Sequence, residues 1–156
     1  MNRSWHLSHL RGYLELGMDR EARRELRVLP DTVREEPPFL AVALQLHQNA
    51  ERWPSAVRIA RKLLKLQPKE AGWWIILAYA TRRSKSIEAA RRILIRAAKQ
   101  HPSEPTTQFN LACYAAQLGS IGEARTRLAR AISREPGFAK LAETDPDLEP
   151  MRRSKE

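Results

Sequence analysis

The sequence has few of the features that secreted or membrane proteins depend on. Its 156 residues include one cysteine, Cys113, so no disulfide can form within the chain. The longest uncharged apolar run, residues 71–81, is about half of the roughly 20 residues that a membrane-spanning helix needs. Polar and charged residues interrupt the first 17 positions, where a signal peptide would be apolar. We therefore expect a soluble, cytoplasmic protein.

Glycine is also scarce, at 6 residues, and no segment shows the alternation of a half-buried strand. Between its prolines the chain is rich in Ala, Leu, Arg and Glu, which favour helices. Apolar residues recur at helical spacing, as at Ala56, Ile59, Ala60 and Leu63. The sequence predicts an all-α protein, long enough to fold around its own core.

The helical pattern repeats every 34 residues. The heptapeptide LGMDREA at residues 16–22 returns three periods later as LGSIGEA at residues 118–124. Four columns of apolar residues keep the period: Ala22, Ala56, Ala90 and Ala124; Leu26, Ala60, Leu94 and Leu128; Leu29, Leu63, Ala97 and Ala131; and Leu10, Leu44, Ala78 and Ala112. Each copy predicts a helical hairpin, in which Gly17 and Gly119 end the first helix in a left-handed conformation. Pro68, Pro102 and Pro136 end the second helix of later copies.

The fourth copy resembles the tetratricopeptide repeat (TPR) family. Asn110, Gly119, Glu123, Ala124 and Pro136 stand at positions that match the family's 34-residue pattern. The resemblance covers residues 4–138 and implies a right-handed superhelical α-solenoid of three to four hairpins.

The repeats are expected at about residues 4–37, 38–70, 71–104 and 105–138 of a TPR domain over residues 1–138. The first copy departs from the pattern because Pro30 interrupts its second helix. Residues 139–156 are expected to form a capping helix, with Phe138, Leu141 and Ala142 inward, followed by a turn and a frayed basic tail.

The resemblance implies that the first helices of successive repeats line a concave groove for a peptide or protein segment. By analogy the groove residues are Leu7, Arg11, Ala41, Gln45, Gln48, Ile75, Tyr79, Arg82, Phe109 and Cys113. We expect the partner to carry apolar anchors and some acidic residues, and the protein to act as a scaffold, adaptor or chaperone. In the alternative interpretation, parts of the groove are filled by the protein's own terminus or are simply exposed to solvent.

The chain is basic, with 28 Lys and Arg against 18 Asp and Glu and a net charge of +10. Three columns on the second helices stack into a predicted basic ridge, formed by Arg24, Arg58 and Arg92, by Lys62, Arg96 and Arg130, and by Lys65 and Lys99. This ridge is an alternative site, for nucleic-acid phosphates or an anionic surface. It can equally be a set of solvated helix faces partly neutralised by Glu21, Glu25, Glu88 and Glu123, because no aromatic residues interleave it for base stacking.

The sequence contains no glycine loop for phosphates, no HExxH and no nucleophile elbow. We therefore expect no enzymatic activity and no cofactor. His6 and His9 lack a second ligand cluster, and Asp145 and Asp147 lack the spacing of an EF-hand, so we expect no metal site and assign the aspartates to helix capping. Cys113 is expected to be a buried or groove-lining thiol.

Overall fold

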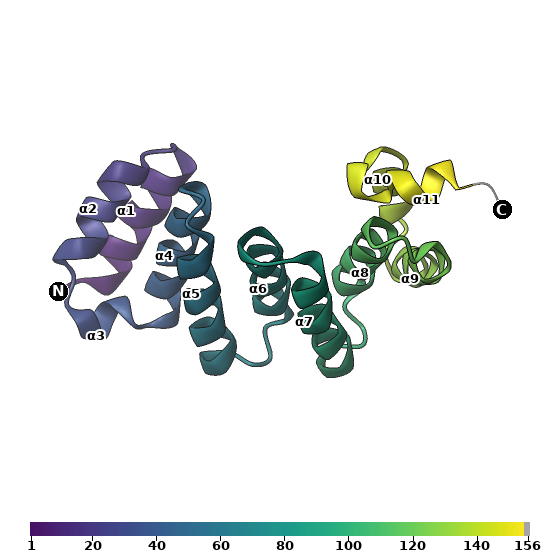
Figure 1. The fold of residues 1–156 in the computed structure, drawn as a ribbon. Helices are drawn as coiled ribbons and strands as arrows, with labels where there is room; N and C mark the ends of the chain where they lie inside the picture. Colours follow the sequence, from purple (N-terminus) through teal and green to yellow (C-terminus); the bar gives the residue numbers. More distant parts are fainter. Residues whose placement is uncertain (155–156) are drawn as a thin grey trace. The chain divides into compact units, whose positions relative to one another are not determined.

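The computed structural model describes residues 1–154, in which every regular element is a helix (Figure 1). The elements are α1 (Arg3–Glu15), α2 (Asp19–Val28), α3 (Asp31–Arg34), α4 (Pro37–Asn49), α5 (Trp53–Leu66), α6 (Ala71–Ser84), α7 (Ile87–Gln100), α8 (Pro105–Gln117), α9 (Ile121–Arg134), α10 (Phe138–Thr144), the 3-10 helix η1 (Pro146–Leu148) and α11 (Glu149–Arg153). None of the helices in this part of the chain is long and apolar enough to cross a membrane. The chain forms two compact units, unit 1 over Met1–Trp73 and unit 2 from Trp74 onward.

Three hairpin turns, after α1, α4 and α8, share one backbone conformation. Gly17, Glu51 and Gly119 occupy the same column of the repeat and have φ angles of 68°, 53° and 80°. The amide after each donates to a carbonyl five residues back, as Ser120 N does to Ala115 O at 2.8 Å. This is the left-handed helix cap expected of Gly17 and Gly119. A Cβ at either glycine would meet nothing within 4 Å, so the backbone angle alone favours glycine there.

Unit 1 is built from the hairpins α1–α2 and α4–α5. Alanine and leucine of the predicted columns are fully buried in it, among them Leu10, Ala22, Ala56 and Leu63. Small residues at these columns let neighbouring helices approach closely. Pro30 ends α2 early, as predicted, and the chain forms the short helix α3 before α4 begins.

Unit 2 is built around α7, α8 and α9. Its core contains the column residues Ala90, Leu94, Ala112 and Ala124, all with no exposed surface. Both α7 and α9 end two residues before a proline, because the residue preceding proline is pushed into extended conformation. The 34-residue period therefore marks both the core and the helix ends.

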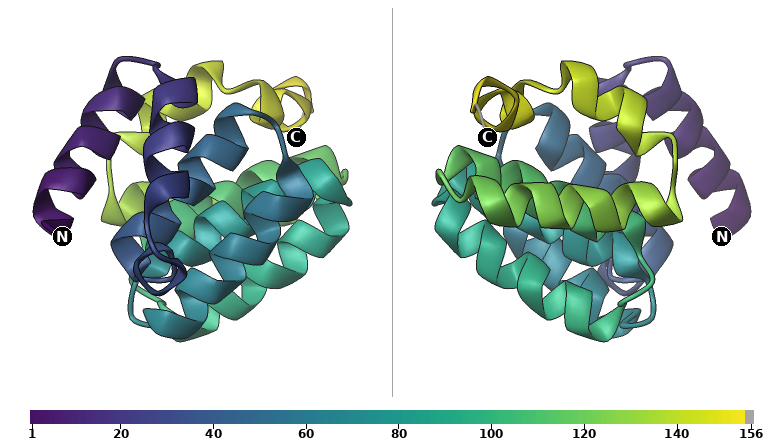
Figure 2. Two further views of the ribbon diagram at one scale, coloured as in Figure 1. Left: turned by 90° about the vertical axis from the view of Figure 1, so that its left-hand side faces the viewer. Right: turned by 90° about the vertical axis from the view of Figure 1, so that its right-hand side faces the viewer.

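The C-terminal segment packs on the last hairpin, where Figure 2 shows α10 and α11 beside α8 and α9. Phe138 and Ala142 face inward as expected, but Leu141 is 47% exposed, so its predicted burial is wrong. The expected frayed tail is also wrong within the described residues. Leu148 is fully buried, and Arg152 in α11 donates from Nη1 to the carbonyls of Ala142 and Asp145 at 2.7 and 2.9 Å. These contacts order the tail as far as α11.

Candidate functional site

Unit 1 has an open cleft between α1 and α4, named here the α1–α4 cleft. It measures about 380 Å³ and is lined by Arg11, Leu14, Glu15, Gln45 and Asn49. The structure thus brings together two predicted groove residues, Arg11 and Gln45, on the first helices of two successive repeats. Glu15 and Asn49 had not been predicted, although each lies one helical turn after a predicted residue and therefore on the same helix face.

The polar side chains of α4 in this cleft are positioned by hydrogen bonds. Gln45 Nε2 donates to Asn49 Oδ1 at 2.7 Å, and Asn49 Nδ2 donates to Asp19 Oδ1 at 3.0 Å. Arg11 is exposed and forms no ion pair with any of residues 1–154. The cleft therefore presents one free guanidinium beside two amide side chains.

The remaining groove residues predicted in unit 1 lie deeper. Leu7 is half-buried and packs against the unit 1 core, and Ala41 and Gln48 are half-buried on α4. None of these three residues lines the α1–α4 cleft.

In unit 2, the corresponding face of α8 is covered by the protein's own C-terminal segment. The ring of Phe109 stacks on Phe138, with centroids 4.6 Å apart and planes at 16°. Phe109 and Cys113 are only 4% and 3% exposed, and Leu148 is fully buried in the same cluster. The interpretation in which the chain fills part of its own groove holds for these two residues.

Arg82, the groove arginine predicted on α6, holds the same segment. Its guanidinium bonds both carboxylate oxygens of Asp147, with Nη2 to Oδ1 at 2.9 Å, and Gln117 Nε2 donates to the carbonyl of Asp147 at 3.0 Å. The hydrogen bond to Asp147 raises the pKa of Arg82 above its ordinary value. Arg82 also lies over the Tyr114 ring, 5.3 Å from its centroid. On the same helix Ile75 is half-buried and Tyr79 is 46% exposed.

Cys113 lies beside two carboxylates under the C-terminal segment. Ligand atoms of Cys113, Asp145 and Asp147 all lie within 4.8 Å of one another. Burial raises the pKa of the Cys113 thiol to about 12, so it is protonated at neutral pH and is not a ready nucleophile. Asp145 Oδ1 accepts from the backbone amide of Asp147 at 2.9 Å, and Asp147 is engaged by Arg82. Asp145 thus caps η1, as expected, and the cluster has a structural explanation.

The predicted basic ridge has residues in both units. In unit 1, Lys62 donates to both oxygens of Glu35 at 2.9 and 2.7 Å, while Arg24 and Arg58 are exposed. In unit 2, Arg92, Arg96 and Arg130 are exposed. Two of the acidic residues expected to neutralise the ridge have other partners: Glu25 pairs with His6 at 2.5 Å, and Glu123 pairs with Arg91 and Arg127.

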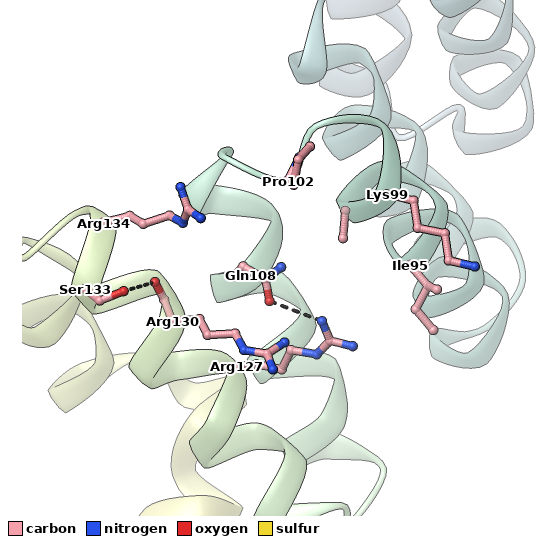
Figure 3. A pocket seen from close by; sticks show the side chains of 9 residues that line it. Ile95, Lys99, Pro102, Gln108, Arg127, Arg130, Ser133 and Arg134 are labelled. Atoms are coloured by element: carbon pink, nitrogen blue, oxygen red, sulfur yellow. Dashed lines mark hydrogen bonds between the residues drawn. The ribbon is translucent and has the colours of Figure 1, made fainter.

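A second cleft, the α7–α9 cleft, lies between α7, α8 and α9 of unit 2. It measures about 510 Å³, within the range typical of ligand sites. Its polar lining residues are Lys99, Gln108, Arg127, Arg130, Ser133 and Arg134. Figure 3 shows the arginines of α9 extending toward Gln108, with Ile95 and Lys99 on α7 across from them. Of these residues the ridge prediction included Lys99 and Arg130.

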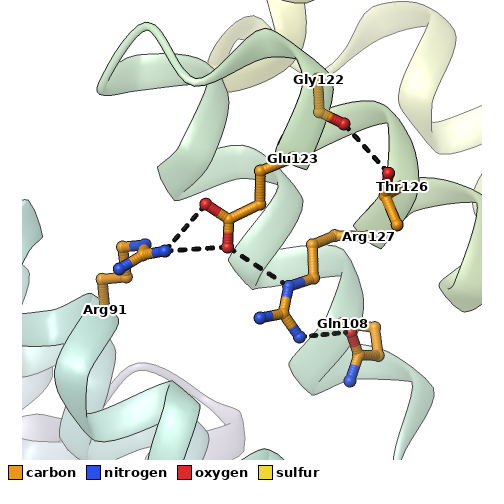
Figure 4. A network of polar contacts seen from close by, with 6 residues as sticks. All are labelled: Arg91, Gln108, Gly122, Glu123, Thr126 and Arg127. Carbon is orange, nitrogen blue, oxygen red and sulfur yellow. Dashed lines mark hydrogen bonds and ion pairs between the residues drawn. The ribbon is translucent and has the colours of Figure 1, made fainter.

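A polar network holds one edge of the α7–α9 cleft (Figure 4). Arg91 Nη2 donates to both carboxylate oxygens of Glu123 at 2.8 Å, and Arg127 Nε reaches the same carboxylate at 3.4 Å. Arg127 Nη1 donates to Gln108 Oε1 at 3.2 Å. Glu123 is thus shared by two arginines, and it is the one acidic residue of this network.

No protein-family model matches the sequence, and no curated protein does either. Solved structures are similar in fold. MamA from Desulfovibrio magneticus RS-1 is 17% identical, with a TM-score of 0.70 over 99% of this chain and 97% of that one. YrrB, described as a TPR protein with an unusual peptide-binding site, is 14% identical, with a TM-score of 0.65 over 94% of this chain and 80% of that one. The chain therefore has the TPR fold and belongs to the all-α solenoid class.

Proposed function

We propose that the protein is a non-enzymatic interaction module that binds a peptide or protein segment at the α1–α4 cleft of unit 1. The observation that carries this proposal is the open cleft of about 380 Å³ lined by Arg11 and Gln45. The TPR fold supports it, since YrrB, which shares the fold, is described as having a peptide-binding site.

The lining of the cleft suggests the chemistry of the partner. The Arg11 guanidinium can pair with a carboxylate, and Leu14 offers an apolar contact. The amide side chains of Gln45 and Asn49 can donate to and accept from the backbone of an extended segment. The partner is then a segment with apolar anchors and at least one acidic residue. Because the hairpins are preorganised, mainly the partner loses conformational entropy on binding.

The experiment uses peptides selected against the full-length chain from a random display library. The affinity of the strongest peptide is measured by calorimetry for the native chain, for Arg11→Glu and for Arg20→Glu. Arg20 is an exposed arginine of α2 outside the cleft, so both variants change the net charge equally. We expect Arg11→Glu to weaken binding at least tenfold, about 1.4 kcal/mol, and Arg20→Glu less than twofold. Equal affinity for all three proteins would disprove the site.

Nucleic-acid binding at the basic ridge is the alternative function. Arg92 and Arg96 favour it, because both are exposed and neither pairs with a carboxylate within residues 1–154. Binding of duplex or single-stranded oligonucleotides would then fall steeply with salt. It would also be lost when Arg58, Arg92 and Arg96 are all changed to Gln. No binding at low salt would eliminate this function.

A further inference from the structure

The α7–α9 cleft of unit 2 has an equivalent in unit 1, two 34-residue periods earlier in the sequence. The unit 1 cleft, named the α2–α5 cleft, measures about 470 Å³. Five equivalent pairs, each 68 residues apart, line both clefts: Asp31 and Lys99, Arg34 and Pro102, Leu40 and Gln108, Ile59 and Arg127, and Lys62 and Arg130. The same place in the repeat is therefore a cleft in both units, and the two clefts differ in charge.

In unit 1, the protein's own carboxylates pair with two of the three Arg and Lys side chains that line the cleft. Asp31 and Glu35 lie at the start and just beyond the end of α3, and they pair with Arg34 and Lys62 respectively. In the α7–α9 cleft, Lys99 replaces the aspartate and no acidic residue lines the cavity. Within residues 1–154, Lys99, Arg130 and Arg134 form no ion pair. Three cations without an ion pair in this part of the chain, from two helices, thus line one cavity.

A buried polar group also faces this cavity. Gln108 is 8% exposed and lines the cleft, and its Oε1 accepts from Arg127. This bond leaves the two N–H groups of Nε2 available, and they have no hydrogen-bond partner among the described residues. An amide donor without a partner in residues 1–154, beside cations that form no ion pair there, suits an anionic ligand.

We propose that the α7–α9 cleft binds a phosphate monoester. Such a group carries a charge of about −1.5 to −2 and three acceptor oxygens, which suits three cations and one amide donor better than a single carboxylate does. Arginine is suited to the geometry of a phosphate. The cleft contains no aromatic residue on which a base could stack, so the structure favours an isolated phosphate group over a nucleic-acid strand.

This proposal is independent of peptide binding at the α1–α4 cleft, which belongs to the other unit. The phosphate can belong to a phosphorylated side chain of a partner protein or to a free small molecule. Both sources share the chemistry that the cleft recognises, and the experiment below separates them.

The experiment is an NMR titration of the ¹⁵N-labelled full-length chain with three probes. These are a short phosphoserine peptide, the same peptide with unmodified serine, and inorganic phosphate. Binding is followed by the shifts of the Gln108 side-chain amide and of the backbone amides of α9. We expect the phosphoserine peptide to bind and the serine peptide to cause no shift at Gln108. If inorganic phosphate binds as tightly as the phosphopeptide, the ligand is a free phosphate; if it binds at least tenfold more weakly, the ligand is a phosphorylated chain.

Two double variants with equal loss of charge test the location. Arg130→Gln with Arg134→Gln removes two cations of the cleft, and Lys85→Gln with Lys140→Gln removes two exposed cations of unit 2 outside it. We expect the first pair to weaken phosphate binding at least tenfold and the second less than twofold. Equal weakening by both pairs, or equal binding of phosphorylated and unmodified peptides, would overturn the proposal. So would tighter binding of a duplex oligonucleotide than of the phosphopeptide at physiological salt.

Discussion

The two units treat equivalent surfaces in opposite ways. In unit 1 the α1–α4 cleft on the first helices is open, whereas in the α2–α5 cleft Asp31 and Glu35 pair with Arg34 and Lys62. In unit 2 the face of α8 is covered by the C-terminal segment, whereas the α7–α9 cleft keeps free cations. A repeat protein makes the same sites several times. Here the segments that depart from the repeat, α3 and the C-terminal segment, decide which sites stay available.

The largest effect of mutation is expected at the covered face of α8 in unit 2. Leu148→Ala deletes a fully buried side chain of the C-terminal segment, and we expect a loss of about 2–5 kcal/mol in the free energy of unfolding. Removing its contacts should also make Cys113, the one cysteine of the chain, react faster with a thiol reagent. Denaturant unfolding and labelling kinetics measure the two effects.

Leu141→Ala is the matched control, because Leu141 belongs to α10 but is 47% exposed. Its effect should stay within about 0.5 kcal/mol, with no change in labelling. If the reagent labelled Cys113 at the native rate in both leucine variants, the C-terminal segment would not be what covers the face of α8.

The ion pairs Arg82–Asp147 of unit 2 and Lys62–Glu35 of unit 1 should differ in strength. Arg82–Asp147 in unit 2 is 23% and 31% exposed, whereas Lys62–Glu35 in unit 1 is 48% and 58% exposed. Double-mutant cycles with alanine should give a coupling energy of about 1–2 kcal/mol for the first pair and below about 0.5 kcal/mol for the second. Equal coupling energies would contradict the view that the C-terminal segment is held more firmly than the α2–α5 charges.

The hairpin turns offer a comparison at one column of the repeat. Gly119 in unit 2 and Glu51 in unit 1 both have positive φ. We expect Gly119→Ala to lower the free energy of unfolding by about 1 kcal/mol, because it puts a Cβ on a left-handed residue, and Glu51→Gly to raise it by up to about 1 kcal/mol. Gly12→Ala, inside α1, is the control and should be stabilising. Thermal unfolding of the three variants checks the sign of each change. A Gly119→Ala protein as stable as the native chain would exclude strain at this turn.

The smallest expected effect concerns pH and unit 1. Burial, and then the charges of Arg52, Arg58 and Arg23, lower the pKa of His47 below 6.5. As the pH falls, His47 is therefore protonated in the unfolded chain before it is protonated in the folded chain. The free energy of unfolding should decrease from about pH 6.5 downward. The equivalent residue of unit 2 is Ala115, which cannot titrate.

Urea unfolding of the native chain and of His47→Gln at pH 7.5 and 5.5 measures this contribution. We expect the variant to lose less stability than the native chain between the two values. A variant with the same pH dependence as the native chain would show that the neutral state of His47 does not contribute.

Much of the fold could be predicted because repetition makes local signals visible. Ala22, Ala56, Ala90 and Ala124 are all fully buried, and the helix before Pro102 ends where the proline requires. The candidate sites were predicted less completely. Arg11 and Gln45 meet in one cleft, but Phe109 and Cys113 lie under a segment whose Leu148 has no counterpart in the repeats.

Periodic spacing by itself determined the helices, their ends, the small residues between them and the repeated hairpin, since each depends on residues within about one repeat. Only the tertiary structure decided which surfaces are open. Arg82 pairs with Asp147, 65 residues later in the sequence, and Glu35 pairs with Lys62, 27 residues later. Neither sequence separation is a multiple of the 34-residue period. Pairs of this kind form because folding brings together charges that are far apart in the sequence, in a partly buried place for Arg82 and Asp147 and at the exposed surface for Lys62 and Glu35.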